Sequence, residues 1–289
     1  MTALLALSTS LLFGLADFGG GLLTRRFPAL TVVVVSQTIA VVVLGTIVLA
    51  TGAFDQAGPL LWYAVAAGVI GPAAMLAFYR ALALGPMGVV SPLGSLGVVV
   101  PVAVGLFVGD RPGLAQFAGI AVAIVGVVLA GGPELRGAPV RRRAVLLTIL
   151  AAFGFGAVMA LIAEASTTVT GLFLALFVQR VTNVVVGGGA LWLSVRRGGP
   201  MLPEDGGGLR AVGAALPALA FIGLADVAAN GTYAIAAQRG PITVAAVLAS
   251  LYPVVTALAA RVVLKERLKA VQAAGAGLAL VGTVLLATG

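Results

Sequence analysis

Long apolar runs alternate along the chain with short segments that carry nearly all of its charged residues. A helix that crosses the hydrocarbon core of a bilayer needs about 20 predominantly apolar residues, and most of the runs are near that length. The pattern therefore predicts an all-α polytopic membrane protein with ten transmembrane helices. We expect these spans at residues 3–23, 29–50, 59–83, 87–108, 113–131, 144–163, 169–195, 211–237, 241–263 and 269–287.

The order of residues in the first half recurs in the second. A Tyr, a Gly-Pro pair, a Ser-Leu pair, an acidic residue, a Gln and two Gly follow one another over residues 79–126 and again over residues 233–282. Similarity that extends over most of the chain indicates one unit built twice. Nearer the front of each half the matching residues are Phe13-Gly14 with Phe155-Gly156, and Gln37 with Gln179.

The repeating unit holds five spans, and an odd number makes the second copy enter the membrane from the opposite side. We expect one five-helix repeat at residues 1–131, a linker at residues 132–143 and a second repeat at residues 144–289. Inverted repeats are typical of secondary transporters, which bind substrate near the membrane midplane where the repeats meet.

Composition narrows the possible functions. The chain is 61% hydrophobic and only 9% charged, with a mean hydropathy of +1.18, whereas a soluble domain has roughly 25% charged residues. It contains no Cys and no His, which argues against thiolate metal sites and the commonest catalytic bases. We therefore expect no enzyme activity, no cofactor and no bound metal. The isoelectric point near 11.0 does not indicate nucleic-acid binding, because the basic residues lie between apolar runs.

The basic residues also predict an orientation. Of the 17 Lys and Arg residues, fourteen lie on the side that holds the connections after the odd-numbered spans; Arg111 and Arg239 lie on the other side, and Arg180 lies within a span. Positive residues stay in the cytoplasm. The side rich in Arg is therefore expected to be cytoplasmic, with both termini extracytoplasmic, in a cell (inner) membrane.

The repeated block resembles the EamA-type branch of the drug/metabolite transporter superfamily. Residues 264–268, Leu-Lys-Glu-Arg-Leu, followed by Gln272 and Gly275, are similar to the family's Gly-Glu-Arg-Leu and Gln-x-x-Gly motif, with Lys265 in place of Gly. Residues 109–112 are a looser version that has Asp instead of Glu. The resemblance implies a ten-helix basket of two inverted halves that carries small organic metabolites. Family members usually have cytoplasmic termini, which differs from the orientation that the charges predict.

Three ionisable residues lie well away from the ends of predicted spans: Asp17, Arg180 and Asp226. Each costs about 2.5–3.5 kcal/mol to place at the bilayer centre, so such residues usually serve function. We expect them to line a substrate path; alternatively, Arg180 forms a buried pair with Asp226 or Asp17 that only fixes helix packing.

Further polar and aromatic side chains share helix faces with these residues or lie near prolines. Prolines interrupt the spans 87–108 and 241–263, which correspond in the two halves, and paired interruptions point to a transporter's binding site. The remaining candidate substrate-binding residues are Ser10, Tyr79, Ser91, Ser95, Asn230, Tyr233, Ser250 and Tyr252.

Together these features predict a secondary transporter or exporter of small organic metabolites that works by alternating access. The two acids and Arg180 suit amino acids or related compounds, as in the amino-acid exporters of the YddG type. The alternative is a proton-coupled antiporter of cationic drugs, and a membrane enzyme or lipid scramblase is a remote third. The expected partners are a small-molecule substrate and the lipid bilayer, for a monomer or a homodimer.

Overall fold

The computed structural model describes residues 2–98, 100, 113–131, 141–165, 168–202, 208–239, 249, 251–265 and 270–288. These residues form ten α-helices and two short 3-10 helices, and no strand occurs among them. The α-helices are α1 (Thr2–Leu23), α2 (Ala29–Thr51), α3 (Leu61–Leu84), α4 (Met87–Gly94), α6 (Leu114–Gly131), α7 (Arg142–Ala165), α8 (Val169–Arg196), α9 (Gly208–Arg239), α11 (Tyr252–Val263) and α12 (Ala270–Thr288). The 3-10 helices are η1 (Ala53–Gln56) and η2 (Ser95–Val98).

Local chemistry sets several helix ends. α2 follows Pro28 and stops at Gly52, whose φ of 65° is left-handed and whose amide bonds back to the last turn; glycine adopts this conformation at no steric cost. α8 begins at Thr168, whose hydroxyl accepts a hydrogen bond from the Gly171 amide at 3.1 Å, as a side-chain N-cap does.

Eight of the described helices coincide with predicted spans to within a few residues, and α4 and α11 each cover part of the spans 87–108 and 241–263. Within the described residues, six of them are long and apolar enough to cross a membrane, namely α1, α2, α3, α7, α8 and α9. Two interruptions were expected near prolines. α4 gives way to η2 after Gly94, and Pro253 lies in the first turn of α11, directly after a turn at Leu251. Pro101 lies outside the described residues, and the structure adds interior prolines at Pro72 and Pro217.

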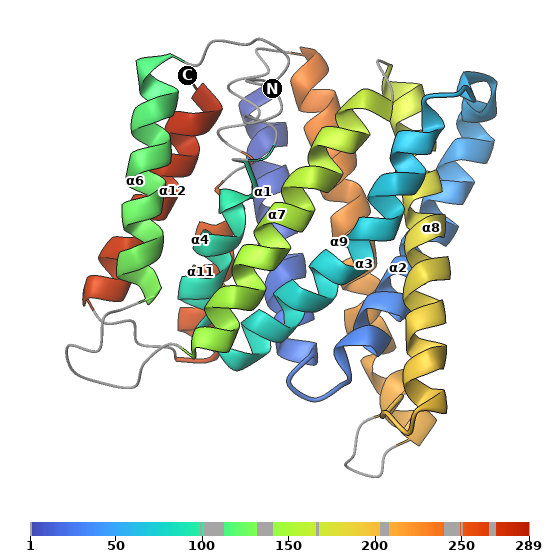
Figure 1. Cartoon of the computed structure of the whole chain (residues 1–289). Helices are drawn as coiled ribbons and strands as arrows, with labels where there is room; N and C mark the ends of the chain where they lie inside the picture. Colours follow the sequence, from blue (N-terminus) through green and yellow to red (C-terminus); the bar gives the residue numbers. More distant parts are fainter. Residues whose placement is uncertain are drawn as a thin grey trace.

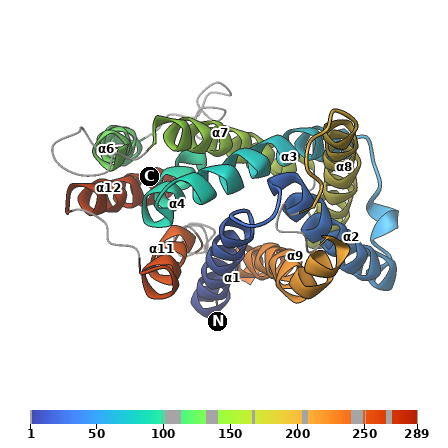
Figure 2. The same cartoon turned by 90° about the horizontal axis from the view of Figure 1, so that it is seen from below.

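The helices form two sets, α1 to α6 and α7 to α12. The contacts between helices of one set and the other follow the same pattern when the two sets are exchanged. α1 packs on α9 as α7 packs on α3, and α2 packs on α9 as α8 packs on α3. α2 pairs with its counterpart α8, and α6 pairs with α12. Seen along the helices in Figure 2, α6 and α12 form one end of an elongated bundle, and α2 and α8 form the other.

The first helix of each set also crosses the fourth segment of the other set through a glycine. A Cβ at Gly14 of α1 would lie 2.6 Å from the Tyr252 carbonyl oxygen of α11. Gly156 of α7 makes the corresponding approach, because a Cβ there would lie 2.7 Å from the Val100 Cβ. The backbones are therefore too close for any side chain, as in many membrane helix contacts.

A glycine also brings the fifth and tenth spans close together. A Cβ at Gly126 of α6 would lie 2.9 Å from the Gly275 carbonyl oxygen and 2.8 Å from the Ala279 Cα of α12. The two helices therefore approach closely along this seam.

Both termini lie at the same end of the bundle, since α1 begins and α12 ends at the top of Figure 1. An even number of crossings requires this arrangement. The basic residues that follow or end the odd-numbered spans gather at the opposite end. Among the described residues these are Arg25, Arg26, Arg80, Arg141, Arg142, Arg143, Arg196, Arg197, Arg210, Arg261 and Lys265.

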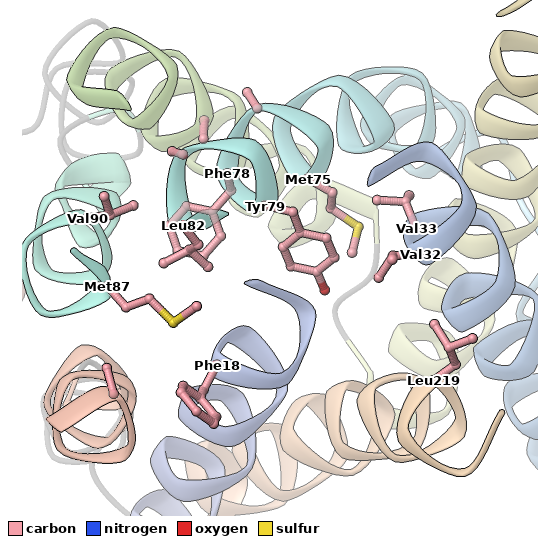
Figure 3. Packing of buried hydrophobic residues seen from close by; sticks show 14 residues of the cluster. Phe18, Val32, Val33, Met75, Phe78, Tyr79, Leu82, Met87, Val90 and Leu219 are labelled. Atoms are coloured by element: carbon pink, nitrogen blue, oxygen red, sulfur yellow. The ribbon is translucent and has the colours of Figure 1, made fainter. Parts of the chain in front are cut away.

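The main apolar core lies where α3 faces α1 and α4. Figure 3 shows Phe78, Tyr79 and Leu82 extending from α3 toward Phe18 of α1 and Met87 of α4. Phe78 also stands edge-on to Phe155 of α7, with ring centroids 5.5 Å apart. This core fixes α3 against α1 and thereby places Tyr79 beside the charged residues described next.

Candidate functional site: a buried charged cluster

The centre of the cluster is an ion pair between α8 and α9. Arg180 Nη2 lies 2.7 Å from Asp226 Oδ2, and the two side chains are 9% and 18% exposed. One of the two predicted pairings of Arg180 is thus present, and no described cation pairs with the other acid, Asp17. Taking both charges out of water is expensive, so the pair needs further hydrogen bonds to offset that cost.

Gln37 of α2 supplies the clearest of these bonds. Its Oε1 accepts a 2.7 Å hydrogen bond from Arg180 Nη1 and a 3.4 Å bond from Asn183 Nδ2. Gln37 is 1% exposed and Asn183 is also 1% exposed. The cluster therefore spans three helices, with the guanidinium held between an amide from α2 and a carboxylate from α9.

Several polar atoms of the cluster have no hydrogen-bond partner within the described part of the chain. These atoms are Gln37 Nε2, Gln179 Oε1, Arg180 Nε and Asn183 Oδ1. Leaving one buried polar group unpaired costs about 1–3 kcal/mol. A cluster that served helix packing alone would be expected to satisfy its groups, so the surplus donors and acceptors favour a binding role.

Asn230 and Tyr233 lie on α9 with Asp226, but their described contacts are with α9 itself and with α1. Asn230 Nδ2 donates to the Asp226 carbonyl oxygen at 2.7 Å, one turn back along α9. Tyr233 packs beside Ala236 and against Leu5 and Ala6 of α1. The helical spacing that joins these residues with Asp226 is therefore correct, while Tyr233 points toward α1.

Asp17 is half-buried on α1. It lies within electrostatic range of Asp226 and of both Tyr79 and Tyr252. No side chain of the described residues forms an ion pair or hydrogen bond with it. The described cluster thus holds two carboxylates and one guanidinium.

Two tyrosines approach Asp17 from different helices. Tyr79 of α3 is 3% exposed and packs on Gly20, where a Cβ would lie 2.8 Å from its hydroxyl. The Tyr252 ring of α11 stands edge-on to Phe13, with centroids 6.2 Å apart. In Figure 3 the Tyr79 hydroxyl points away from α3, toward the region between α1 and α9.

The predicted serines are dispersed. Ser10 of α1 is 2% exposed and Ser91 of α4 is fully buried, and the Ser91 hydroxyl has no partner in the described residues. Ser95 begins η2, but its side chain lies outside the described part, as does the whole of Ser250. Among the described side chains, neither Ser10 nor Ser91 forms a hydrogen bond with the ion pair.

Sequence reasoning missed Gln37 as a member of the site, whereas Gln179 and Asn183 share their helix with Arg180 and are expected from the sequence to line the same path. Gln37 bears no charge, so an apolar span carries it without the large penalty that marks Asp17 or Arg180. A signal was present nonetheless. Gln37 and Gln179 occupy equivalent positions of the internal repeat, and the two helices that carry them, α2 and α8, pack against each other.

Comparison with known proteins agrees with this architecture. No curated protein sequence matches the chain. A protein of known crystal structure is similar to it in fold, with a TM-score of 0.62, 18% sequence identity, and coverage of 99% of this chain and 96% of that one. The model of the EamA-like transporter family matches twice, over residues 1–132 and 142–288. The chain is therefore a membrane transporter of small molecules and belongs to the EamA-like transporter family.

Proposed function

We propose that this chain is a secondary transporter that moves small organic metabolites, amino acids or related compounds, by alternating access around the buried charged cluster. The observation that carries the proposal is the Arg180–Asp226 pair at 2.7 Å, held by Gln37 at 2.7 Å. Charged and amide groups buried in a membrane bundle commonly mark a substrate path.

The cluster draws its residues from both proposed halves. Asp17, Gln37 and Tyr79 belong to residues 1–131, and Arg180 and Asp226 belong to residues 144–289. A relative rotation of the halves would change the distances among these groups. A solute bound between them would therefore favour one arrangement over another, which is the physical requirement for coupling binding to a conformational change.

The halves are proposed to move as inverted copies joined by the linker at residues 132–143. The repeated helix contacts support this division, because the packing of α1 on α9 matches that of α7 on α3, and the packing of α2 on α9 matches that of α8 on α3. Alternating access in such folds is largely a rocking of one repeat against the other around a fixed site.

The chemistry of the cluster suits a solute with charged groups. A guanidinium binds carboxylates in a fixed planar geometry, while a carboxylate binds ammonium groups. Arg180, Asp226 and Asp17 supply both kinds of partner, and the buried amides of Gln37 and Asn183 add neutral donors and acceptors. Amino acids carry a carboxylate and an ammonium group on a small skeleton, and their derivatives keep one or both of these groups.

In the membrane, the end rich in arginine is proposed to be cytoplasmic, which places both termini outside a cell (inner) membrane. The support is the cluster of eleven described Lys and Arg residues at that end. At the other end, the described residues include Asp55 and Glu164 together with Arg239. Cytoplasmic loops carry such an excess of basic residues because they resist translocation.

Transport by the purified protein tests the proposal. Proteoliposomes containing the full chain are given a panel of radiolabelled amino acids and amines, with and without a pH gradient, and counterflow of each solute is measured. The control is a set of liposomes containing the Arg180→Met/Asp226→Asn variant. We expect saturable counterflow of at least one solute in the wild type alone. Failure of every solute in both gradient conditions would overturn the proposed substrate class.

A further inference from the structure

Asp17 occupies a special place in the cluster because its charge is not matched. Arg180 is already paired with Asp226 at 2.7 Å and bonded to Gln37. Of the three ionisable residues well away from the span ends, Asp17 is left without an opposite charge among the described residues. An ionised carboxylate without an opposite charge in the interior attracts a cation.

The helix that carries Asp17 has a glycine one turn away on each side. Gly14 lets the backbone of Tyr252 approach, since a Cβ there would lie 2.6 Å from its carbonyl oxygen. Gly20 lets the ring of Tyr79 lie directly on α1. Residues three apart share a helix face, so the carboxylate lies between the approaches of the two tyrosine-bearing helices.

The side chain of Tyr79 provides a second, independent indication of a ligand. It is 3% exposed, and within the described ranges no residue forms a hydrogen bond with its hydroxyl. Buried tyrosine hydroxyls usually find a partner. The hydroxyl points toward the region between α1 and α9 in Figure 3, and Tyr79 is within electrostatic range of Asp17, Asp226 and Arg180.

A carboxylate together with tyrosine side chains from neighbouring helices is the chemistry that recognises an organic ammonium group. The carboxylate supplies the opposite charge, and tyrosine faces attract cations by about 0.5–2 kcal/mol, more when water is excluded. Apolar residues of the main core, including Phe18 and Met75, surround Tyr79, and the low polarity there strengthens electrostatic attraction.

We propose that Asp17, Tyr79 and Tyr252 form a subsite for the ammonium group of the transported solute. The inference rests on the proposed function and names its substrate class: compounds with a protonated amine. A carboxylate on the solute reaches Arg180 only by displacing Asp226 from their 2.7 Å pair, so it adds less to binding than the amine does. Amines and amino-acid amides therefore bind more tightly than the parent amino acids, and deaminated acids do not bind.

Binding to the purified full chain in lipid nanodiscs tests this subsite. The probes are matched sets on the leucine and phenylalanine skeletons, each with the amine, the amino-acid amide, the amino acid and the deaminated acid. Thermal stability is measured against probe concentration. We expect the apparent Kd to rise from the amine to the amide to the amino acid. The deaminated acids should leave the melting temperature of the protein unchanged. Asp17→Asn weakens amine binding about tenfold or more, as loss of one charged contact implies.

Two further variants keep the test decisive if Asp17→Asn does not fold. Gly20→Ala displaces the Tyr79 ring, whereas Gly188→Ala on α8 meets open space and serves as its control. Asp55→Asn, an exposed acid outside the spans, is the control for charge. Weaker amine binding in Gly20→Ala alone supports the subsite.

The outcomes separate this inference from the function on which it rests. If no amine stabilises the wild type, or if the acids bind as well as the amines, the ammonium subsite is wrong even when proteoliposomes transport other solutes. If Asp17→Asn folds and binds amines unchanged, the subsite is also wrong. Amine binding without transport of any solute would instead overturn the proposed function and leave the subsite standing.

Discussion

Replacing Arg180 with Met is expected to destabilise the protein strongly, and replacing Asp226 as well is expected to restore much of the loss. The single variant removes a 2.7 Å ion pair and a 2.7 Å hydrogen bond to Gln37, and it leaves the Asp226 carboxylate in the interior with no opposite charge. Removing one member of a buried pair typically costs about 3–5 kcal/mol.

The double variant Arg180→Met/Asp226→Asn carries no unmatched charge between α8 and α9. What remains is the unpaired Gln37 oxygen, since Asn183 donates to it only at 3.4 Å. A buried acceptor without a good partner costs about 1–3 kcal/mol. We therefore expect the double variant to be more stable than Arg180→Met by about 2 kcal/mol.

The measurement is reversible unfolding in mixed detergent micelles with increasing fractions of a denaturing detergent. Arg196→Met is the matched control on the same helix, because Arg196 is exposed and stacks on Trp192 with its guanidinium carbon 3.9 Å from the ring centroid. We expect that control to change the free energy of unfolding by less than about 1 kcal/mol. A double variant as unstable as Arg180→Met would refute the interpretation that charge matching dominates at this site.

Two other predictions concern packing and orientation. Gly126→Ala places a methyl group 2.9 Å from the Gly275 carbonyl oxygen and is expected to destabilise the α6–α12 seam by about 1–3 kcal/mol; Gly277→Ala on α12 meets nothing within 4 Å and should be neutral in the same detergent unfolding assay. Because the chain has no native cysteine, single cysteines report topology without a background. A membrane-impermeant maleimide should label Asp55→Cys in intact cells and Arg197→Cys only after permeabilisation, and the reverse result would contradict the proposed orientation.

The positions of the helices were predictable because the bilayer fixes both length and polarity. α1, α2 and α3 were placed by apolar runs that end at charged or glycine-proline segments, and their observed bounds differ from the predicted ones by only a few residues. The role of Pro253 was not predictable in the same way. A proline fits both the interior of a kinked span and the first turn of a new helix, and only the start of α11 at Tyr252 distinguishes them.

The candidate site was predictable in its charged members and not in their pairing. Helical spacing places Asp226 and Asn230 on one face, but the choice between Asp17 and Asp226 as partner of Arg180 depends on how α1 and α9 are rotated against α8. That rotation follows from contacts such as the bond between Thr9 and Thr232, whose oxygens are 2.8 Å apart. Side-chain contacts far apart in sequence carry no periodic signal, so the partners of Arg180 required the structure.

The two glycine crossings have a thermodynamic consequence for the resting state of the protein. At one crossing Thr256 donates a 2.9 Å hydrogen bond to the Gly14 carbonyl oxygen, whereas the equivalent position of the first half is Pro101, which has no hydroxyl to donate. One such bond contributes about 1 kcal/mol, a population ratio of about five to one. If opening one crossing accompanies closing the other, the empty carrier would spend most of its time with the Thr256 crossing closed, and Thr256→Val would shift that balance toward the opposite orientation.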